Sequence, residues 1–330
     1  MKTSEFIPDL RADLDPKDMS REQQGQTYHL ELVKHCDLCG GSRFEQELVR
    51  DNWTLVKCID CGLIFTSPRF GQTYLQRLYR DNYYQRASAY LSMQAASPSK
   101  DDYCLSSQLK KICCTGRNDR KPRSLDVGCG AGRLTKAFQE NGWEAVGVDI
   151  SLKATGIGIN AGLDLRAIEL GDSSLGLFDV ITCFHVLEHA HSPSFFLFQC
   201  AEHLSENGYL LIEVPDYRSR RALKLGKNWP YLYPSIHLYQ FTSQTLGNYL
   251  ERSKFRVIKT RRVHGKGLLE NSASHVGYKS QWQTRFKNSL FAMRHVLYWS
   301  PIPRQLVRYL FWHALRYGEC IRILAQKTSL

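Results

Sequence analysis

The stretch "LDVGCGAGRLTKAF", which begins at Leu125, constrains the fold of this chain more than any other. An apolar run ends at Asp126 and is followed by three alternating glycines, Gly128, Gly130 and Gly132, before a pattern of helical period begins. A strand, a glycine turn and a helix N-terminus in this order allow the backbone to approach a bound ligand closely. The stretch therefore predicts a nucleotide-type binding turn.

Apolar runs alternate with helical patterns through the rest of the chain. The runs are "SLDVGC", "WEAVGVDI", "DLRAIEL", "FDVITCFHV" and "GYLLIEVP". This order is typical of an α/β fold, in which a parallel sheet is covered by helices on both faces. Ligands of such sheets bind at the carboxyl ends of the strands, where the first glycine turn lies.

The residues of the turn leave the identity of the nucleotide open. The dinucleotide spacing G-x-G-x-x-G is not met, because the glycines alternate and residue 133 is Arg. Asp149 closes the second strand in "GVDIS" and is placed to accept hydrogen bonds from two ribose hydroxyls. These features suit NAD, S-adenosylmethionine (SAM) and other adenosine ligands alike.

Four cysteines near the N-terminus form two C-x-x-C-G knuckles separated by 18 residues: Cys36, Cys39, Cys58 and Cys61. The two-residue spacer lets both sulfurs of a knuckle face one ion, and the following glycine eases the tight turn. We expect a tetrahedral zinc site that is structural, because four protein ligands leave no open position. The alternatives are two redox pairs or a chance spacing.

The segments "LDVGCGAGRLTKAF", "GVDIS" and "FDVITCFHVLEHAHSP" occur in this order. Together they resemble the class I SAM-dependent methyltransferases, especially the branch with ubiquinone-biosynthesis O-methyltransferases and many sugar-pathway enzymes. The resemblance runs from about Arg123 to the C-terminus. The knuckles resemble the zinc-binding segment that precedes this domain in bacterial methyltransferases of polysaccharide and deoxysugar pathways. The resemblance implies a Rossmann-like seven-stranded methyltransferase sheet, a preceding zinc ribbon, and SAM as the cofactor.

The resemblance also assigns a set of cofactor-binding residues at the ends of the first four strands: Asp126, Gly128, Gly130, Asp149, Glu169, Leu170, Phe184 and His185. It implies that the glycines approach the amino acid part of SAM and that Asp149 holds the ribose. Glu169 and Leu170 would then lie beside the adenine, with Phe184 and His185 lining the pocket.

His237 is the candidate catalytic residue. It lies in the loop "WPYLYPSIHLYQFT" after the fifth strand. Sugar C-methyltransferases that resemble this chain carry His-Glu-His here, whereas this sequence has Ser235 and Ile236 before His237. This departure speaks against C-methylation and leaves one proton acceptor for a substrate hydroxyl. The alternative is that His237 only anchors the loop.

Three further residues, His185, Glu188 and His189, are spaced to share one face of a helical turn. The spacing admits a metal pair, but a three-ligand site needs another donor, and the resemblance favours a cofactor-side and structural role for Glu188 and His189.

The sequence divides into four expected parts. Residues 1–30, polar and mixed in charge, are expected to be a flexible leader, 31–70 the zinc ribbon, 71–121 a helical linker, and 122–330 the methyltransferase domain with a helical insertion at 264–316. The N-terminus lacks a secretory signal, and no apolar run is long enough to span a membrane. We therefore expect a cytoplasmic protein.

The net charge of +12 is concentrated late in the chain, with +10 in residues 215–267 and +7 in residues 281–330. This asymmetry suggests an acidic partner: a phosphorylated substrate, an anionic membrane surface or nucleic acid. The segment "PRQLVRYLFWHALRY" reads as a basic amphipathic helix. Such a helix packs on its own domain or rests peripherally on the inner face of a membrane.

The function expected from these features is methyl transfer from SAM to a small molecule, with a sugar or a glycan or lipid-linked precursor as the acceptor. Oxygen is the expected acceptor atom, and nitrogen and carbon stay open. Two alternatives stay open. A nucleic-acid methyltransferase would use the ribbon and the basic surface to bind phosphates, with strongly salt-dependent affinity. A non-catalytic scaffold would keep the fold without binding SAM.

Overall fold

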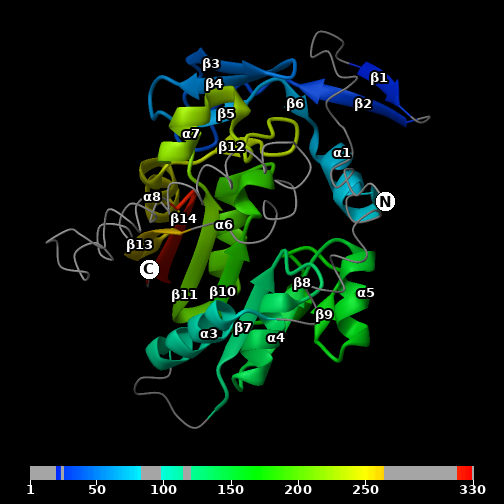
Figure 1. Ribbon diagram of the computed structural model, residues 1–330, viewed down its shortest axis with the longest axis vertical. Coiled ribbons are helices and arrows are strands. Elements are labelled where there is room, and N and C mark those ends of the chain that lie inside the picture. Colours follow the sequence, from blue (N-terminus) through cyan, green and yellow to red (C-terminus); the bar gives the residue numbers. More distant parts are fainter. Residues whose placement is uncertain (1–19, 24–25, 83–97, 114–119, 264–317, 329–330) are drawn as a thin grey trace, which may run out of the picture.

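The computed structural model describes residues 20–23, 26–82, 98–113, 120–263 and 318–328 (Figure 1). The whole of the expected insertion at 264–316, including the amphipathic helix, lies outside the described residues, as does the start of the expected leader. Within the described part of the chain, no helix is both long and apolar enough to cross a membrane.

Residues 123–327 contain a seven-stranded sheet with the strand order β13-β14-β11-β10-β7-β8-β9. Strands β7 to β11 pair in parallel, and β14 pairs antiparallel with β11 and β13. The strands are β7 (Arg123–Val127), β8 (Glu144–Val148), β9 (Leu165–Arg166), β10 (Phe178–Phe184), β11 (Leu204–Pro215), β13 (Phe255–Val263) and β14 (Cys320–Lys327). The predicted Rossmann-like methyltransferase sheet is thereby confirmed.

Helices cover both faces of this sheet. Since neighbouring residues of a strand point to opposite faces, a strand that is covered on both sides is apolar at successive positions. Val180 of β10 packs in a cluster with α3 (Lys100–Cys113) and α4 (Arg133–Glu140). Ile181, the next residue, packs in the cluster that contains α6 (Pro193–Glu202) and α8 (Ser243–Arg252). The continuous apolar run of β10 therefore supplies two cores.

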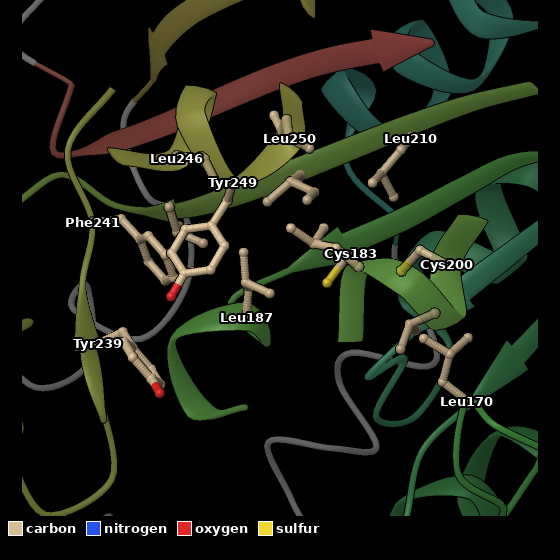
Figure 2. Packing of buried hydrophobic residues seen from close by; sticks show 14 of the residues in the cluster. Leu170, Cys183, Leu187, Cys200, Leu210, Tyr239, Phe241, Leu246, Tyr249 and Leu250 are labelled. Atoms are coloured by element: carbon tan, nitrogen blue, oxygen red, sulfur yellow. The ribbon is translucent and has the colours of Figure 1, made fainter. Parts of the chain in front are cut away.

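The core on the α6 and α8 side reaches the carboxyl end of β10. Figure 2 shows Leu187, which follows β10, gathered with Tyr249, Leu246 and Leu250 of α8. All four side chains are at least 99% buried. Ser192 caps the first turn of α6, so the segment between β10 and α6 is fixed at both ends.

The remaining helices are short connections. They are α5 (Leu152–Asn160) between β8 and β9, α7 (Arg220–Leu225) after β11, and the 3₁₀ turns Ser173–Leu175, Leu187–His189 and Gly226–Asn228. In the expected linker the chain forms α1 (Gln72–Arg77), then the π-helical turn Leu78–Asn82, and α3 follows at Lys100–Cys113.

The N-terminal part contains two small antiparallel sheets, seen at the top of Figure 1. One has the order β1-β2-β6 and the other β12-β5-β4-β3. The strands are β1 (Ser20–Gln23), β2 (Gln26–Glu31), β3 (Phe44–Arg50), β4 (Trp53–Cys58), β5 (Ile64–Thr66), β6 (Arg69–Phe70) and β12 (Tyr239–Gln240). β1 and nearly all of β2 lie in the segment expected to be leader. This end of the segment is part of a sheet, because β2 pairs with β6 and buries Leu30.

Candidate functional site

The glycine turn lies at the carboxyl end of β7. This strand lies between β8 and β10, at the point where the strand order of the parallel sheet reverses. Gly128 donates its N–H to the carbonyl of Val148 at 2.8 Å. Its φ of +69° suits glycine, and a Cβ there would lie 2.3 Å from Cγ2 of Val186. The segment after β10 therefore packs directly against the turn.

Asp149 braces the same turn from the end of β8. One carboxylate oxygen accepts the N–H of Gly130 at 3.0 Å, and the other accepts the N–H of Ser151 at 2.9 Å. Burial raises the pKa of Asp149, while these two hydrogen bonds oppose that shift. The structure thus joins two of the expected cofactor residues, Gly130 and Asp149, at one edge of the sheet.

Asp126 is placed below the turn, inside β7. Its carboxylate accepts hydrogen bonds from the hydroxyl of Thr182 on β10 at 2.7 Å and from the hydroxyl of Thr135 on α4 at 3.5 Å. Burial raises the pKa of Asp126 to about 7. These contacts tie β7 to β10 and α4, so in this arrangement Asp126 supports the turn.

The other expected cofactor residues lie at the ends of β9 and β10. Glu169 is exposed and accepts a hydrogen bond from Gln76 of α1 at 3.0 Å, while Leu170 is buried. Phe184 ends β10, and the guanidinium of Arg322 lies 4.9 Å from its ring centroid. α1 thus borders the edge of the sheet where the adenine of SAM is expected.

His185 follows Phe184 with a φ of +56° and is held between two carboxylates. Its Nδ1 lies 3.4 Å from Glu188, and its Nε2 lies 3.3 Å from Glu213. Burial alone would lower the pKa of His185, but Cys320, Glu188 and Glu213 raise it well above its usual value. The ring stacks on Tyr231 at a centroid distance of 6.0 Å.

Glu188, His189 and His237 form a second cluster next to His185. One potential ligand atom from each of the three lies within 4.8 Å of the other two. The ring of His237 meets that of His189 edge-on at 4.6 Å. The cluster joins the 3₁₀ turn after β10 to the loop that carries the predicted catalytic residue.

The two imidazoles of this cluster are hydrogen-bonded to backbone carbonyls. Nδ1 of His237 donates to the carbonyl of Tyr231 at 2.7 Å. Nδ1 of His189 lies between two oxygens, the carbonyl of Ile236 at 3.0 Å and the hydroxyl of Tyr79 at 2.6 Å. Burial, followed by the proximity of His189, lowers the pKa of His237 to about 3. Burial also lowers the pKa of His189. Both rings are therefore neutral at physiological pH.

Glu188 is 1% exposed, and within the described part of the chain neither of its carboxylate oxygens has a hydrogen-bond partner. Burial alone would raise its pKa, but the contact with His185 at 3.4 Å is the main cause that lowers it, to about 2. A buried, ionised carboxylate without hydrogen bonds is costly and needs an explanation.

Sequence reasoning did not single out Glu213 or Cys320, which lie beside His185 on β11 and β14. No short motif joins them, because sheet pairing brings them together from distant parts of the chain. The spacing of His185, Glu188 and His189 was the visible signal, and the third histidine, His237, comes from a separate loop.

Residues 99–260 match a protein family described as a methyltransferase domain. In this segment, just under half of the chain, the sequence is therefore similar to methyltransferase domains. It is 32% identical over 101 residues to the ubiquinone biosynthesis O-methyltransferase of Burkholderia ambifaria, covering 28% of this chain and 44% of that protein. It is 35% identical over 113 residues to the enzyme of the same name from Methylococcus capsulatus, covering 32% and 47%. The chain thus spans less than half the length of these curated relatives.

A solved structure of magnesium protoporphyrin IX methyltransferase from Synechocystis PCC 6803 with bound SAH is also similar. It is 14% identical, with a TM-score of 0.46, and the match covers 78% of this chain and all of that one.

The four knuckle cysteines converge in front of the methyltransferase domain. Their sulfurs all lie within 4.8 Å of one another, and the pairs Cys36–Cys61 and Cys39–Cys58 are each 3.5 Å apart. A tetrahedral zinc ion with Zn–S bonds of about 2.3 Å holds its sulfurs about 3.8 Å apart, so this set fits the ion closely. The geometry also fits the expected closed, structural site.

The cysteine module docks on the methyltransferase domain through Asp37, inside the first knuckle. Its carboxylate accepts hydrogen bonds from the hydroxyl of Ser192 at 2.6 Å, the backbone N–H of Ser194 at 2.9 Å and the hydroxyl of Tyr249 at 3.0 Å. The knuckle thus contacts both α6 and α8.

A second contact reaches the loop that holds His237. β5 pairs with β12, the strand that begins two residues after His237. Thr66 of β5 donates its N–H to the carbonyl of Leu238 and its hydroxyl to that of Pro234, each at 2.9 Å. The cysteine module therefore forms one wall of the His237 loop.

Proposed function

We propose that this protein transfers the methyl group of SAM to a hydroxyl oxygen of a small molecule. The observation that carries the proposal is the glycine turn braced by Asp149, at the end of β7 in the segment that matches the methyltransferase family. The relatives with about a third of residues identical are named O-methyltransferases, which supports oxygen as the acceptor atom.

When bound, SAM supplies an electrophilic methyl group on a sulfonium. The acceptor oxygen forms the new C–O bond as the S–CH₃ bond breaks, and the electron pair stays with sulfur. The chain's own task is to align the acceptor with that bond and to remove the hydroxyl proton. The cluster of Glu188, His189 and His237 lies at the same edge of the sheet as the glycine turn and is proposed to face the acceptor.

We propose a sugar or a glycan or lipid-linked precursor as the acceptor, carrying a phosphate. The support is the charge beside the His237 loop, where exposed basic side chains follow β11: Arg218, Arg220, Arg221, Lys224 and Lys227. A mass-spectrometric assay with SAM would compare nucleotide sugars, polyprenyl-linked sugars, a polyprenyl phenol and an oligonucleotide. Methylation of the oligonucleotide alone would overturn the proposal.

The SAM site predicts a defined loss of affinity in the Asp149→Ala variant. Because Asp149 is proposed to hold the ribose and also braces Gly130, its loss should cost about 1 to 3 kcal/mol, or roughly tenfold to a hundredfold in the dissociation constant for SAM. Calorimetric titration measures this. Asp164→Ala is the matched control, since Asp164 pairs with Arg166 on the surface. Equal affinities in the two variants would remove Asp149 from the site.

We also propose that the four cysteines hold one structural Zn²⁺. Four thiolates of this spacing form a closed tetrahedral site, so the ion would stabilise the module and take no part in methyl transfer. The knuckle backbone supports this geometry, because the N–H groups of Gly40 and Gly62 close tight turns onto the carbonyls of Cys36 and Cys58, each at 2.8 Å.

A further inference from the structure

The cluster of Glu188, His189 and His237 brings three potential metal-ligand atoms close together in the protein interior. His237 donates Nδ1–H to a backbone carbonyl and so keeps a lone pair on Nε2. His189 keeps one as well in the tautomer in which its Nδ1–H faces the carbonyl of Ile236 and the hydroxyl of Tyr79. The Glu188 carboxylate is an acceptor on both oxygens and has no hydrogen-bond partner in the described part of the chain. The His185 ring lies 3.4 Å from one oxygen of Glu188, on one side of the group, and a cation among the three potential ligands would pair them on the other side.

We propose that Glu188, His189 and His237 bind a divalent transition-metal ion. Two imidazole nitrogens and one carboxylate oxygen are a common donor set for Zn²⁺ and for non-haem iron. Metal-binding histidines regularly donate the other ring N–H to a backbone carbonyl, which fixes the tautomer. His237 does so here, and Nδ1 of His189 faces the carbonyl of Ile236 and the hydroxyl of Tyr79.

The spacing of the three groups fits an ion after a small movement. Their ligand atoms lie within 4.8 Å of one another. Bonds of about 2.1 Å to one ion place ligands at most about 4.2 Å apart, so a ligand pair at the 4.8 Å limit would have to approach by roughly half an ångström. The carboxylate of Glu188 can make this movement without breaking a hydrogen bond, because it has none in the described part of the chain.

Three protein ligands leave at least one coordination position open, unlike the four cysteines, which fill theirs. In the proposed O-methyl transfer, the open position would take the acceptor hydroxyl and lower its pKa, so that its proton passes to water more easily. This role rests on the proposed function, whereas the metal site does not. The buried, weakly basic His237 is better suited to be a ligand than a lone general base.

Mn²⁺ is the probe for this site, because thiolates prefer zinc while imidazole and carboxylate ligands accept manganese. We expect the full-length protein, carrying one Zn²⁺ per chain for the four cysteines and no excess zinc, to bind one Mn²⁺ per chain in a titration followed by electron paramagnetic resonance. The Glu188→Gln and His189→Asn variants should each bind it at least about tenfold more weakly. The His191→Asn variant is the control, since His191 contacts Arg69 outside the cluster.

Melting curves and SAM titrations would show that each variant is folded. The proposal is overturned if the wild-type protein shows no saturable Mn²⁺ binding, which would leave Glu188 buried as an ion pair with His185. It is also overturned if folded Glu188→Gln and His189→Asn bind Mn²⁺ as tightly as His191→Asn does. Metal binding is measured without turnover, so failure of the proposed methyl transfer would be seen separately.

Discussion

Turnover is expected to fall about a hundredfold or more in the His237→Ala variant, while the affinity for SAM stays within about twofold of the wild type. His237 lies in the loop before β12, away from the contact between Gly130 and Asp149 that braces the glycine turn. Removing the imidazole takes away a group on the acceptor side, whether it accepts a proton or holds an ion. The rate constant should therefore change and the cofactor site should not.

Steady-state kinetics and calorimetric SAM titration on the same preparation test this expectation. His203→Ala is a matched control, because His203 also makes a hydrogen bond through Nδ1 to a backbone carbonyl, that of Gly176 at 3.0 Å. Unchanged turnover in His237→Ala would remove this residue from the mechanism. A parallel loss of SAM binding or of melting temperature would show that His237 anchors the fold, since it is 8% exposed and packs against His189.

The sheet and its glycine turn could be predicted because their signals are local. Continuous apolar runs mark strands that are buried on both faces, and Val180 and Ile181 of β10 show why, since they pack in different cores. The positive φ of Gly128 and the closeness of Val186 explain why the turn requires glycine. The four cysteines converge as their spacing predicted, although the bound ion is still a proposal.

The acceptor side could not be predicted from the sequence to the same extent. β12 is two residues long, too short for a periodic pattern, and its pairing with β5 joins segments about 170 residues apart. The tautomers of His189 and His237 depend on carbonyls of the same loop, whose direction only the folded backbone fixes. The general base predicted at His237 stays a prediction, and burial makes its imidazole a weak base.

Loss of the ribbon metal is expected to reach the methyl-transfer step through the β5–β12 pairing. Cys58 is fully buried at the end of β4, and β4 pairs with β5. The Cys58→Ser variant should lose its zinc and melt at a lower temperature, because the binding free energy of a structural zinc is folding free energy. Thr66 would then no longer hold the carbonyls of Pro234 and Leu238 on either side of His237.

The Cys58→Ser variant is therefore expected to lose turnover while it keeps its affinity for SAM. Turnover should fall at least about tenfold, because the His237 loop loses a wall, while SAM affinity should stay within about threefold, because β7 and β8 form the cofactor turn without the ribbon. Cys104→Ser is the control, since Cys104 is exposed on α3 and lies outside the cluster. Zinc-free protein with full turnover would show that the ribbon does not position His237. An equal loss of SAM affinity and turnover would instead mean that the ribbon supports the whole domain, because Asp37 also links it to α6 and α8.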